Sequence, residues 1–433
     1  MTTVSPKTSG IAKDPRGVDL EKRRKQNRLI IGLLAFCGPG LVVMLADTDA
    51  GSLITAAQSG ARWGYAMVLP QLVLIPILYV VQEITVRLGI ITGKGHGALI
   101  REHFGRGWGL ISAGMLFLAG TGALLTEFAG IAGVGELFGV SRDLTVPVAA
   151  AFLIGIAMTG SYRRVERIGI ALGLAELAFI PAVVMAHPSF SAIGKGLGHM
   201  PVGNSSFMLL LAANVGAVIM PWMIFYQQGA VLDKGLRPRD IPRERRITAG
   251  GAVLTQLIMV AVVLAFSATI ARHHAGVTLD SVGEMSAALR PFIGGVGAKV
   301  LLGAGVLGAA LVAGLVASLA GAWGISEVFG WRHTLNELPC RETARFYVVY
   351  GLAHVVGAVV VLFSFDLINL VVDVEVMNAL LLPIVLGLLL ALEARALPYE
   401  HRMHGWRRIL ATSMCFVVIA FGLYTVLVTL RHI

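Results

Sequence analysis

Charged residues are scarce in this chain of 433 residues, since Asp, Glu, Lys and Arg together make up 14% of it. Soluble proteins average about 25%. Apolar residues reach 56%, and the mean hydropathy is +0.79. The core of a soluble protein has no room for so much apolar surface, but a lipid bilayer covers it. The composition therefore excludes a soluble protein and predicts an integral membrane protein.

Cysteine is also rare, with three isolated copies and no CxxC spacing. This pattern argues against a structural zinc site, and we expect no resident cofactor. A cleavable signal peptide is not expected, because the first apolar run is too long for one. Residues 1–28 are polar and basic, and we expect them to form a cytoplasmic N-terminal tail.

Eleven apolar segments are long enough to span a bilayer, which takes about 20 residues. Loops on one side receive the tail, the Lys234–Arg246 stretch and the arginines of segment 395–408, while loops on the other side receive few. The positive-inside rule then places the N-terminus in the cytoplasm and the C-terminus outside the cytoplasmic (inner) membrane. The predicted spans are 29–57, 66–92, 109–137, 144–160, 166–187, 206–230, 248–272, 298–328, 346–364, 368–395 and 409–430.

The net charge of +10 could also indicate a nucleic-acid partner. Once the loops are assigned, however, no basic stripe interleaved with aromatic residues remains. We therefore expect the lipid bilayer and a small substrate as partners and no nucleic acid. The sequence leaves the oligomeric state open.

The first span contains acidic residues that an uninterrupted membrane helix would avoid. It reads GPGLVVMLADTDAGSLITAAQSGARWGY, with Asp47 and Asp49 in the middle. A charge there is costly unless a partner or a water-filled cavity offsets it. Gly51 follows, and Ser52 competes for backbone hydrogen bonds. We predict that the helix unwinds at residues 49–52, which would direct carbonyls and a carboxylate toward one point.

The sixth span is interrupted as well. It reads NVGAVIMPWMIFYQQGA, and Pro221 removes a helical hydrogen bond in mid-span, which frees the carbonyl of Ala217. Met220 adds a thioether immediately before the proline. An ordinary proline kink together with a glycine packing contact is the alternative explanation, but it leaves Asp49 unexplained.

The two interrupted spans occupy matching positions in two halves of five helices, 29–187 and 206–395, and 409–430 forms an additional eleventh helix. Paired broken helices at matching positions are the best sequence indication of a midplane site in an inverted-repeat transporter. The sequence thus predicts an all-α membrane transporter with helices 1 and 6 unwound around its site.

These residues resemble the natural resistance-associated macrophage protein (NRAMP) family of divalent-metal transporters. Gly-Pro-Gly at 38–40 is followed by Asp-Ala-Gly-Ser at 49–52, where the family has Asp-Pro-Gly-Asn. The resemblance covers residues 29–430 and implies a LeuT-like fold of two inverted five-helix repeats plus one helix. Further matches are GAxxMP at 216–221, QSGARWGY at 58–65, LGIITGK at 88–94, TEF at 126–128, and AG at 320–321 with Glu327.

The resemblance implies a set of metal ligands. Asp49 matches the metal-binding aspartate, and Ser52 takes the place of the metal-binding asparagine. Ala217 matches the residue that supplies a backbone carbonyl, and Met220 matches the thioether ligand. Glu127 matches an acid of the third helix that is linked to proton movement.

The departures from the family pattern concern proton-carrying groups. Trp222 and Gln227 stand where the family has histidines, and Leu124 replaces an aspartate. Because none of the three titrates at neutral pH, we expect weak or absent proton coupling. Two acids are added to the pathway: Glu375 replaces a glutamine, and Asp47 replaces a common aromatic residue.

The ligands leave the transported ion open between Mn²⁺ and Mg²⁺. Met220 favours a softer ion such as Mn²⁺ or Fe²⁺ over Ca²⁺. Asp47 and Glu375 suit Mg²⁺, which keeps several waters and binds through one or two carboxylates. The run PWMIFYQQ also resembles the NRAMP-related magnesium transporters. We therefore expect a carrier that imports both ions.

Other functions stay open. A proton-coupled Mn²⁺/Fe²⁺ symporter would use Glu127 and Glu375 as its route. A sodium-coupled amino-acid symporter of the same fold would aim helix amides at a substrate carboxylate, which Asp49 would repel. A leak channel would share the broken helices. An enzyme is not expected, because no motif such as GxSxG or HExxH occurs within the spans.

Overall fold

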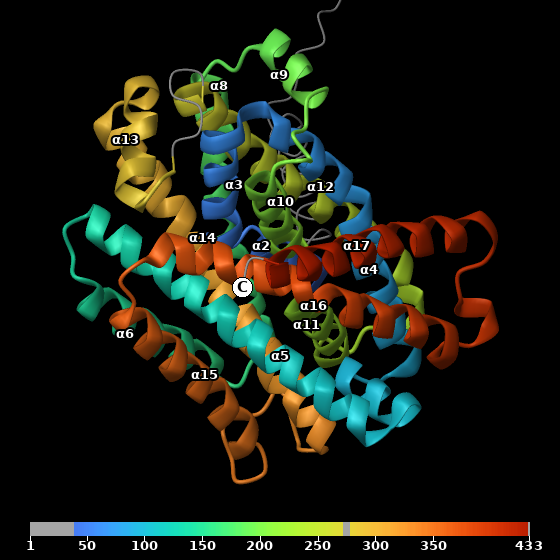
Figure 1. Cartoon of the computed structure of the whole chain (residues 1–433). Coiled ribbons are helices and arrows are strands. Elements are labelled where there is room, and N and C mark those ends of the chain that lie inside the picture. Colours follow the sequence, from blue (N-terminus) through green and yellow to red (C-terminus); the bar gives the residue numbers. More distant parts are fainter. Residues whose placement is uncertain (1–38, 272–277, 432–433) are drawn as a thin grey trace, which may run out of the picture. The chain divides into compact units, whose positions relative to one another are not determined.

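A segment that spans a bilayer must satisfy its backbone hydrogen bonds internally, and a helix does so. The computed structural model describes residues 39–271 and 278–431, and helices make up the regular structure of that part of the chain (Figure 1). They are α2 (Pro39–Asp47), α3 (Ala50–Trp63), α4 (Val68–Thr92), α5 (His96–Leu137), α6 (Arg142–Ala157), α7 (Tyr162–Gly173), α8 (Phe179–Met185), α9 (Phe190–Leu197), α10 (Ser205–Val218), α11 (Pro221–Asp233), α12 (Ile241–Phe266), α13 (Val282–Ile293), α14 (Gly295–Phe329), α15 (Ala344–Phe363), α16 (Leu367–Ala396) and α17 (Gly405–Arg431).

Nine helical stretches of the described residues are long and apolar enough to cross a membrane. One of them, Ala50–Thr92, combines the part of the predicted first span that follows the break, residues 50–57, with the predicted second span, 66–92. Helix α6, on the predicted span 144–160, has only 16 residues and is not among the nine. The tail 1–28 lies outside the described residues. The chain is thus a multi-pass membrane protein, and the count of eleven spans stays a prediction.

The first span is broken at Thr48 and Asp49, between α2 and α3. The sequence suggested a longer unwound segment, 49–52, and the difference has a local cause. The Asp49 carboxylate accepts a hydrogen bond from the Ser52 N–H at 2.6 Å and so caps α3. Residues 50–52 therefore already lie in the helix.

The sixth span is broken at Ile219 and Met220, between α10 and α11. Both residues leave the helical region, with φ −117° and ψ 75° at Ile219 and φ −83° and ψ 137° at Met220. Pro221 is the first residue of α11, where a missing N–H costs no helical hydrogen bond. The proline therefore ends one helix and starts the next.

Glycines allow the broken helices to pack closely against their neighbours. Helix α10 packs extensively against α16, and both also contact α3 (Figure 1). A Cβ at Gly216 of α10 would collide with the backbone carbonyl of Glu375 on α16. The two backbones are therefore in direct contact one residue before Ala217.

Local breaks also divide other long helices. A kink lies within α5 at Gly105, whose φ of 87° favours glycine. The predicted span 166–187 is divided into α7 and α8 by the 3₁₀ turn Leu174–Ala178. The predicted outer loops 188–205 and 273–297 carry the short helices α9 and α13.

Candidate metal site

Asp49 is fully buried in the break between α2 and α3, where its backbone is extended (φ −67°, ψ 176°). Its Oδ1 accepts the Ser52 N–H, which fixes the orientation of the carboxylate. Its Oδ2 is buried and has no hydrogen-bond partner in the described part of the chain. Oδ1 therefore holds the carboxylate in place, and the Glu127 carboxyl lies within hydrogen-bonding reach of Asp49.

The Ser52 hydroxyl joins the two broken helices. Its Oγ lies 2.9 Å from the carbonyl oxygen of Asp47 and 2.8 Å from that of Ala217. A hydroxyl has one proton, so it donates to one of these carbonyls at a time. The structure thus brings the Asp49, Ser52 and Ala217 positions together, while their role as metal ligands stays a prediction.

Met220, the predicted thioether ligand, lies in the break between α10 and α11 and is 1% exposed. Its backbone carbonyl accepts the Met223 N–H at 3.2 Å, which holds the residue at the start of α11. A thioether is a weak acceptor, so its burial requires no hydrogen bond. Ligation by the Met220 sulfur also stays a prediction.

No basic side chain neutralises Asp49, because none of the ion pairs among the described residues includes it. Within the same part of the chain, no three Asp, Glu, His or Cys side chains lie close enough to hold a metal ion. The predicted ligand set does not need such a cluster, since it combines one carboxylate with a carbonyl, a hydroxyl and a thioether. So few charges would leave a bound divalent ion partly hydrated.

Glu127 reaches the break from α5. Its Oε2 accepts the Ala50 N–H at 3.1 Å, and its Oε1 accepts the Thr126 hydroxyl at 3.1 Å. The carboxyl groups of Glu127 and Asp49 also interact electrostatically and lie within hydrogen-bonding reach of each other. A buried acid therefore contacts the first residue of α3.

Glu375 reaches the same region from α16. A Cβ at Gly51 would collide with its Oε1, so the carboxylate lies against the backbone of α3. Its Oε2 accepts the side-chain amide of Asn378 at 3.0 Å. Glu375 also interacts electrostatically with Asp49. This predicted pathway residue therefore lies beside the break in the first span.

Asp47 ends α2 and is 1% exposed. The Gln256 amide lies 3.5 Å from its Oδ2, and its Oδ1 has no hydrogen-bond partner among the described residues. Negative charges on Asp47, Asp49 and Glu375 would repel one another. A cation at this point would reduce that repulsion.

Trp222 and Gln227 follow the second break on α11, and both are fully buried. The indole Nε1 and both amide atoms of these side chains have no hydrogen-bond partner among the described residues. Gln227 lies about 10 Å from Met220 along the helix axis, given a rise of 1.5 Å per residue. It is therefore not at the breaks, and the pathway role of both residues stays a prediction.

One contact at the break was not anticipated from the sequence. The Thr48 hydroxyl donates to the carboxylate of Glu176, which is fully buried in the 3₁₀ turn between α7 and α8. In the sequence, Glu176 is recognisable only as an acidic residue within a predicted span. Such a residue indicates a functional role, but the sequence does not show which residue it contacts. Thr48 thus links the first break to a second irregular segment.

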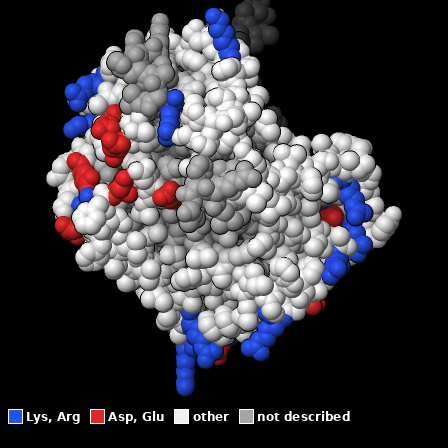
Figure 2. All heavy atoms as spheres, viewed as in Figure 1, with Lys and Arg blue, Asp and Glu red and all other residues white. Residues whose placement is uncertain are grey.

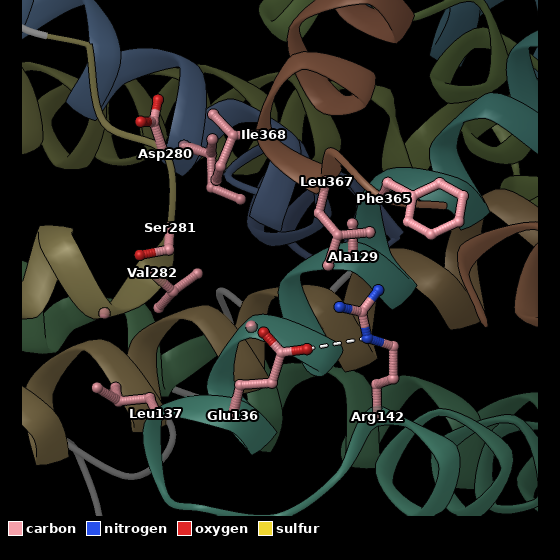
Figure 3. A pocket seen from close by; sticks show the side chains of 13 residues that line it. Ala129, Glu136, Leu137, Arg142, Asp280, Ser281, Val282, Phe365, Leu367 and Ile368 are labelled. Atoms are coloured by element: carbon pink, nitrogen blue, oxygen red, sulfur yellow. Dashed lines mark hydrogen bonds and ion pairs between the residues drawn. The ribbon is translucent and has the colours of Figure 1, made fainter. Parts of the chain in front are cut away.

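A cavity of about 300 Å³ lies one helical turn beyond Ala50, where Ile54 of α3 lines it. Ala129 of α5 and Ile368 of α16 line it as well (Figure 3). Glu136 points toward Arg142 across this cavity, and the two form an ion pair of 2.9 Å. The predicted topology places the cavity on the outer side of the membrane.

Solved structures of transporters share this arrangement of helices. A crystal structure of the Eremococcus coleocola manganese transporter matches with a TM-score of 0.72 and 20% identity, covering 91% of this chain and 86% of that one. MhsT in complex with L-phenylalanine matches with a TM-score of 0.62 and 13% identity, covering 91% and 98%. The chain therefore has the LeuT-like, all-α fold of membrane transporters, as predicted.

Within this class, the chain belongs to the natural resistance-associated macrophage protein-like (Nramp) family, whose model matches residues 40–428. A similar protein is the divalent metal cation transporter MntH 1 of Pseudomonas aeruginosa, 28% identical over 412 residues, which cover 90% of this chain and 91% of that protein. The divalent metal cation transporter MntH of Verminephrobacter eiseniae is 24% identical over 317 residues, or 70% of each. These relatives are transporters, and the chain is not an enzyme.

Proposed function

We propose that the chain is a carrier that imports the divalent cations Mn²⁺ and Mg²⁺ across the cytoplasmic membrane by alternating access. The observation that carries this proposal is the buried Asp49 carboxyl group, which has no ion-pair partner among the described residues, beside the contact of Ser52 with Ala217. A buried carboxylate without a counter-charge is costly, and a cation supplies that counter-charge. The relatives in Pseudomonas aeruginosa and Verminephrobacter eiseniae are divalent metal cation transporters, which supports the proposal.

In this proposal the ligands come from two broken helices. Asp49 supplies the negative charge, Ser52 and the Ala217 carbonyl supply oxygen, and Met220 supplies sulfur, while water completes the shell. The ion enters from the outer cavity at Ile54. Because the ligands belong to two different repeats, movement of one repeat against the other opens the site to either side in turn.

The first prediction concerns the transported ion. The full chain in proteoliposomes is expected to take up both Mn²⁺ and Mg²⁺ saturably, with the tighter apparent affinity for Mn²⁺, because Met220 offers a soft ligand. Radioactive Mn²⁺ uptake and its competition by Mg²⁺ measure this. Good Mn²⁺ uptake without Mg²⁺ uptake at any concentration would contradict the proposal that the chain transports Mg²⁺. Flux that never saturates and shows no counter-transport would indicate a leak channel.

The second prediction concerns proton coupling. Uptake of Mn²⁺ is expected without stoichiometric acidification of the liposome lumen, because Trp222, Gln227 and Leu124 carry no proton at neutral pH. A pH-sensitive dye inside the liposomes measures the proton flux beside the metal flux. Lumenal acidification in fixed proportion to the Mn²⁺ taken up would contradict the prediction.

A proton-coupled Mn²⁺/Fe²⁺ symporter is the second candidate, and one observation favours it. Glu127 binds the Ala50 N–H and interacts with Asp49, so a buried acid that can hold a proton stands next to the ion. If metal uptake is coupled to protons, Glu127→Gln should abolish acidification of the liposome lumen while metal binding is retained. An amino-acid symporter is disfavoured, because Asp49 would repel the substrate carboxylate.

A further inference from the structure

A second and larger cavity lies apart from both broken helices. Its volume is about 1030 Å³, and it lies between α4, the start of α12, the α16–α17 connection and the start of α17. Four arginines line it, against two glutamates. The residues that line it include Glu83, Arg87, Arg245, Arg402, Trp406 and Arg407.

Two of these arginines are already neutralised. Glu83 accepts Arg87 Nη2 at 3.0 Å through Oε2 and Arg245 Nη2 at 2.6 Å through Oε1, so both of its oxygens are occupied. Arg87 also contacts Glu393 at 3.3 Å and donates to the His401 carbonyl at 2.6 Å. This network ties α4 to α12, α16 and the connection.

The other two arginines have no carboxylate partner among the described residues. Arg402 donates from Nε to the Leu397 carbonyl at 2.7 Å, and this bond leaves its two Nη groups for other acceptors. The Arg407 guanidinium lies 5.9 Å from the centre of the Trp406 ring. Figure 2 shows Lys and Arg side chains gathered at the right-hand edge, where Figure 1 shows the connection between α16 and α17. This end of the cavity is therefore positively charged.

The side chains next to this cavity are those of a membrane–water boundary. Trp406 is 69% exposed, and Ile409 and Leu410 of α17 are 70% and 43% exposed. Exposed apolar residues beside tryptophan and arginine mark the level of the lipid headgroups. The cavity thus opens at the depth where lipid phosphates lie.

We propose that this cavity binds a phosphate-bearing anion, with Arg402 and Arg407 as its main donors. The planar guanidinium groups donate in pairs to phosphate oxygens. The first turn of α17 begins between the two arginines, and its free N–H groups add to the attraction for an anion. The phosphate of an anionic lipid and free phosphate offer the same chemistry, and the position at the headgroup level favours the lipid.

The test uses the full chain, purified in detergent and stripped of lipid, with native mass spectrometry to count bound lipids. Phosphatidylglycerol is titrated against phosphatidylcholine, and inorganic phosphate is titrated separately by calorimetry. We expect phosphatidylglycerol to bind preferentially and the double variant R402Q/R407Q to bind it on the order of tenfold more weakly. The matched control is R408Q, a neighbouring exposed arginine outside the cavity, which should leave binding unchanged.

The possible results distinguish an anionic lipid from free phosphate as the bound anion. The cavity is assigned to free phosphate if two results are found together. The double variant binds inorganic phosphate more weakly than wild type, and wild type does not prefer phosphatidylglycerol over phosphatidylcholine. Equal binding of phosphatidylglycerol by wild type and the double variant, or no binding of either anion, overturns the proposal. Because Arg402 also holds the connection, the single variant R407Q is measured as well and should weaken binding by itself. A thermal unfolding transition like that of wild type shows that each variant is folded, and this control does not depend on the transport proposal.

Discussion

Replacing Asp49 with asparagine is expected to abolish measurable Mn²⁺ uptake and to weaken Mn²⁺ binding roughly 100-fold or more. Asp49 is the one carboxylate of the proposed ligand set, and even residues that only support a ligand are worth about 10–100-fold in metal affinity. Asparagine keeps an oxygen that can accept the Ser52 N–H and is itself a good helix cap. The variant therefore removes the charge while α3 keeps its start. Calorimetry and proteoliposome uptake measure the two effects.

A matched control exists at the start of α16. Asp366 caps that helix in the same way, by accepting the Asn369 N–H at 3.1 Å, but it is exposed. Asp366→Asn should leave both binding and uptake within twofold of wild type. If Asp49→Asn also leaves binding within twofold of wild type, Asp49 does not hold the ion.

The second large effect is expected from Gly216→Ala, which should destabilise the protein by about 1–3 kcal/mol or more. A Cβ there would meet the backbone carbonyl of Glu375 and the N–H of Ala379. Backbone atoms cannot rotate away as a side chain can, so α10 must move from α16. That movement also displaces Ala217, and uptake should fall with stability. Thermal unfolding in detergent and uptake per folded molecule measure the two losses.

The control for this variant is Gly387→Ala on α16. Nothing lies within 4 Å of a Cβ at Gly387, so the substitution adds no clash. Alanine is also the better helix former, by roughly 0.5–1 kcal/mol. Gly387→Ala should therefore be as stable as wild type or slightly more stable. Equal stability of the Gly216 and Gly387 variants would show that α10 and α16 are not in backbone contact.

The breaks in the two helices could be predicted because they depend on local chemistry. A charge at Asp49 in an apolar run and a proline at 221 both conflict with an uninterrupted helix. The length of the first break was overestimated because Asp49 itself caps α3. The short span predicted at 144–160 corresponds to the 16-residue helix α6, Arg142–Ala157.

The long-range contacts around the site could not be predicted from one sequence. The approach of Glu375 to Gly51 and the hydrogen bond from Thr48 to Glu176 join residues more than a hundred positions apart. Helical periodicity indicates which side a residue faces within its own helix, but not which helix lies opposite it. The glycines were the available signal, because close backbone approach needs them, and Gly51 and Gly216 both lie in the recognised motifs.

The proposed transport function and the basic cavity concern different parts of the protein. The acids at the breaks are buried among α3, α5 and α16, whereas Arg402 and Arg407 lie at the α16–α17 connection. The Glu83–Arg87 network joins α4 to that connection. A lipid held there would therefore contact helices of both predicted repeats, 29–187 and 206–395. Its removal is expected to leave metal binding intact.

The most direct test of the central claim is to locate the ion by anomalous scattering from crystals of the full chain soaked in Mn²⁺. One peak is expected between the two breaks, in contact with the Asp49 carboxylate, the Ala217 carbonyl and the Met220 sulfur. The same soak of Asp49→Asn crystals should give no peak. A peak that persists in the variant, or an ion bound away from both breaks in the wild type, would contradict the account.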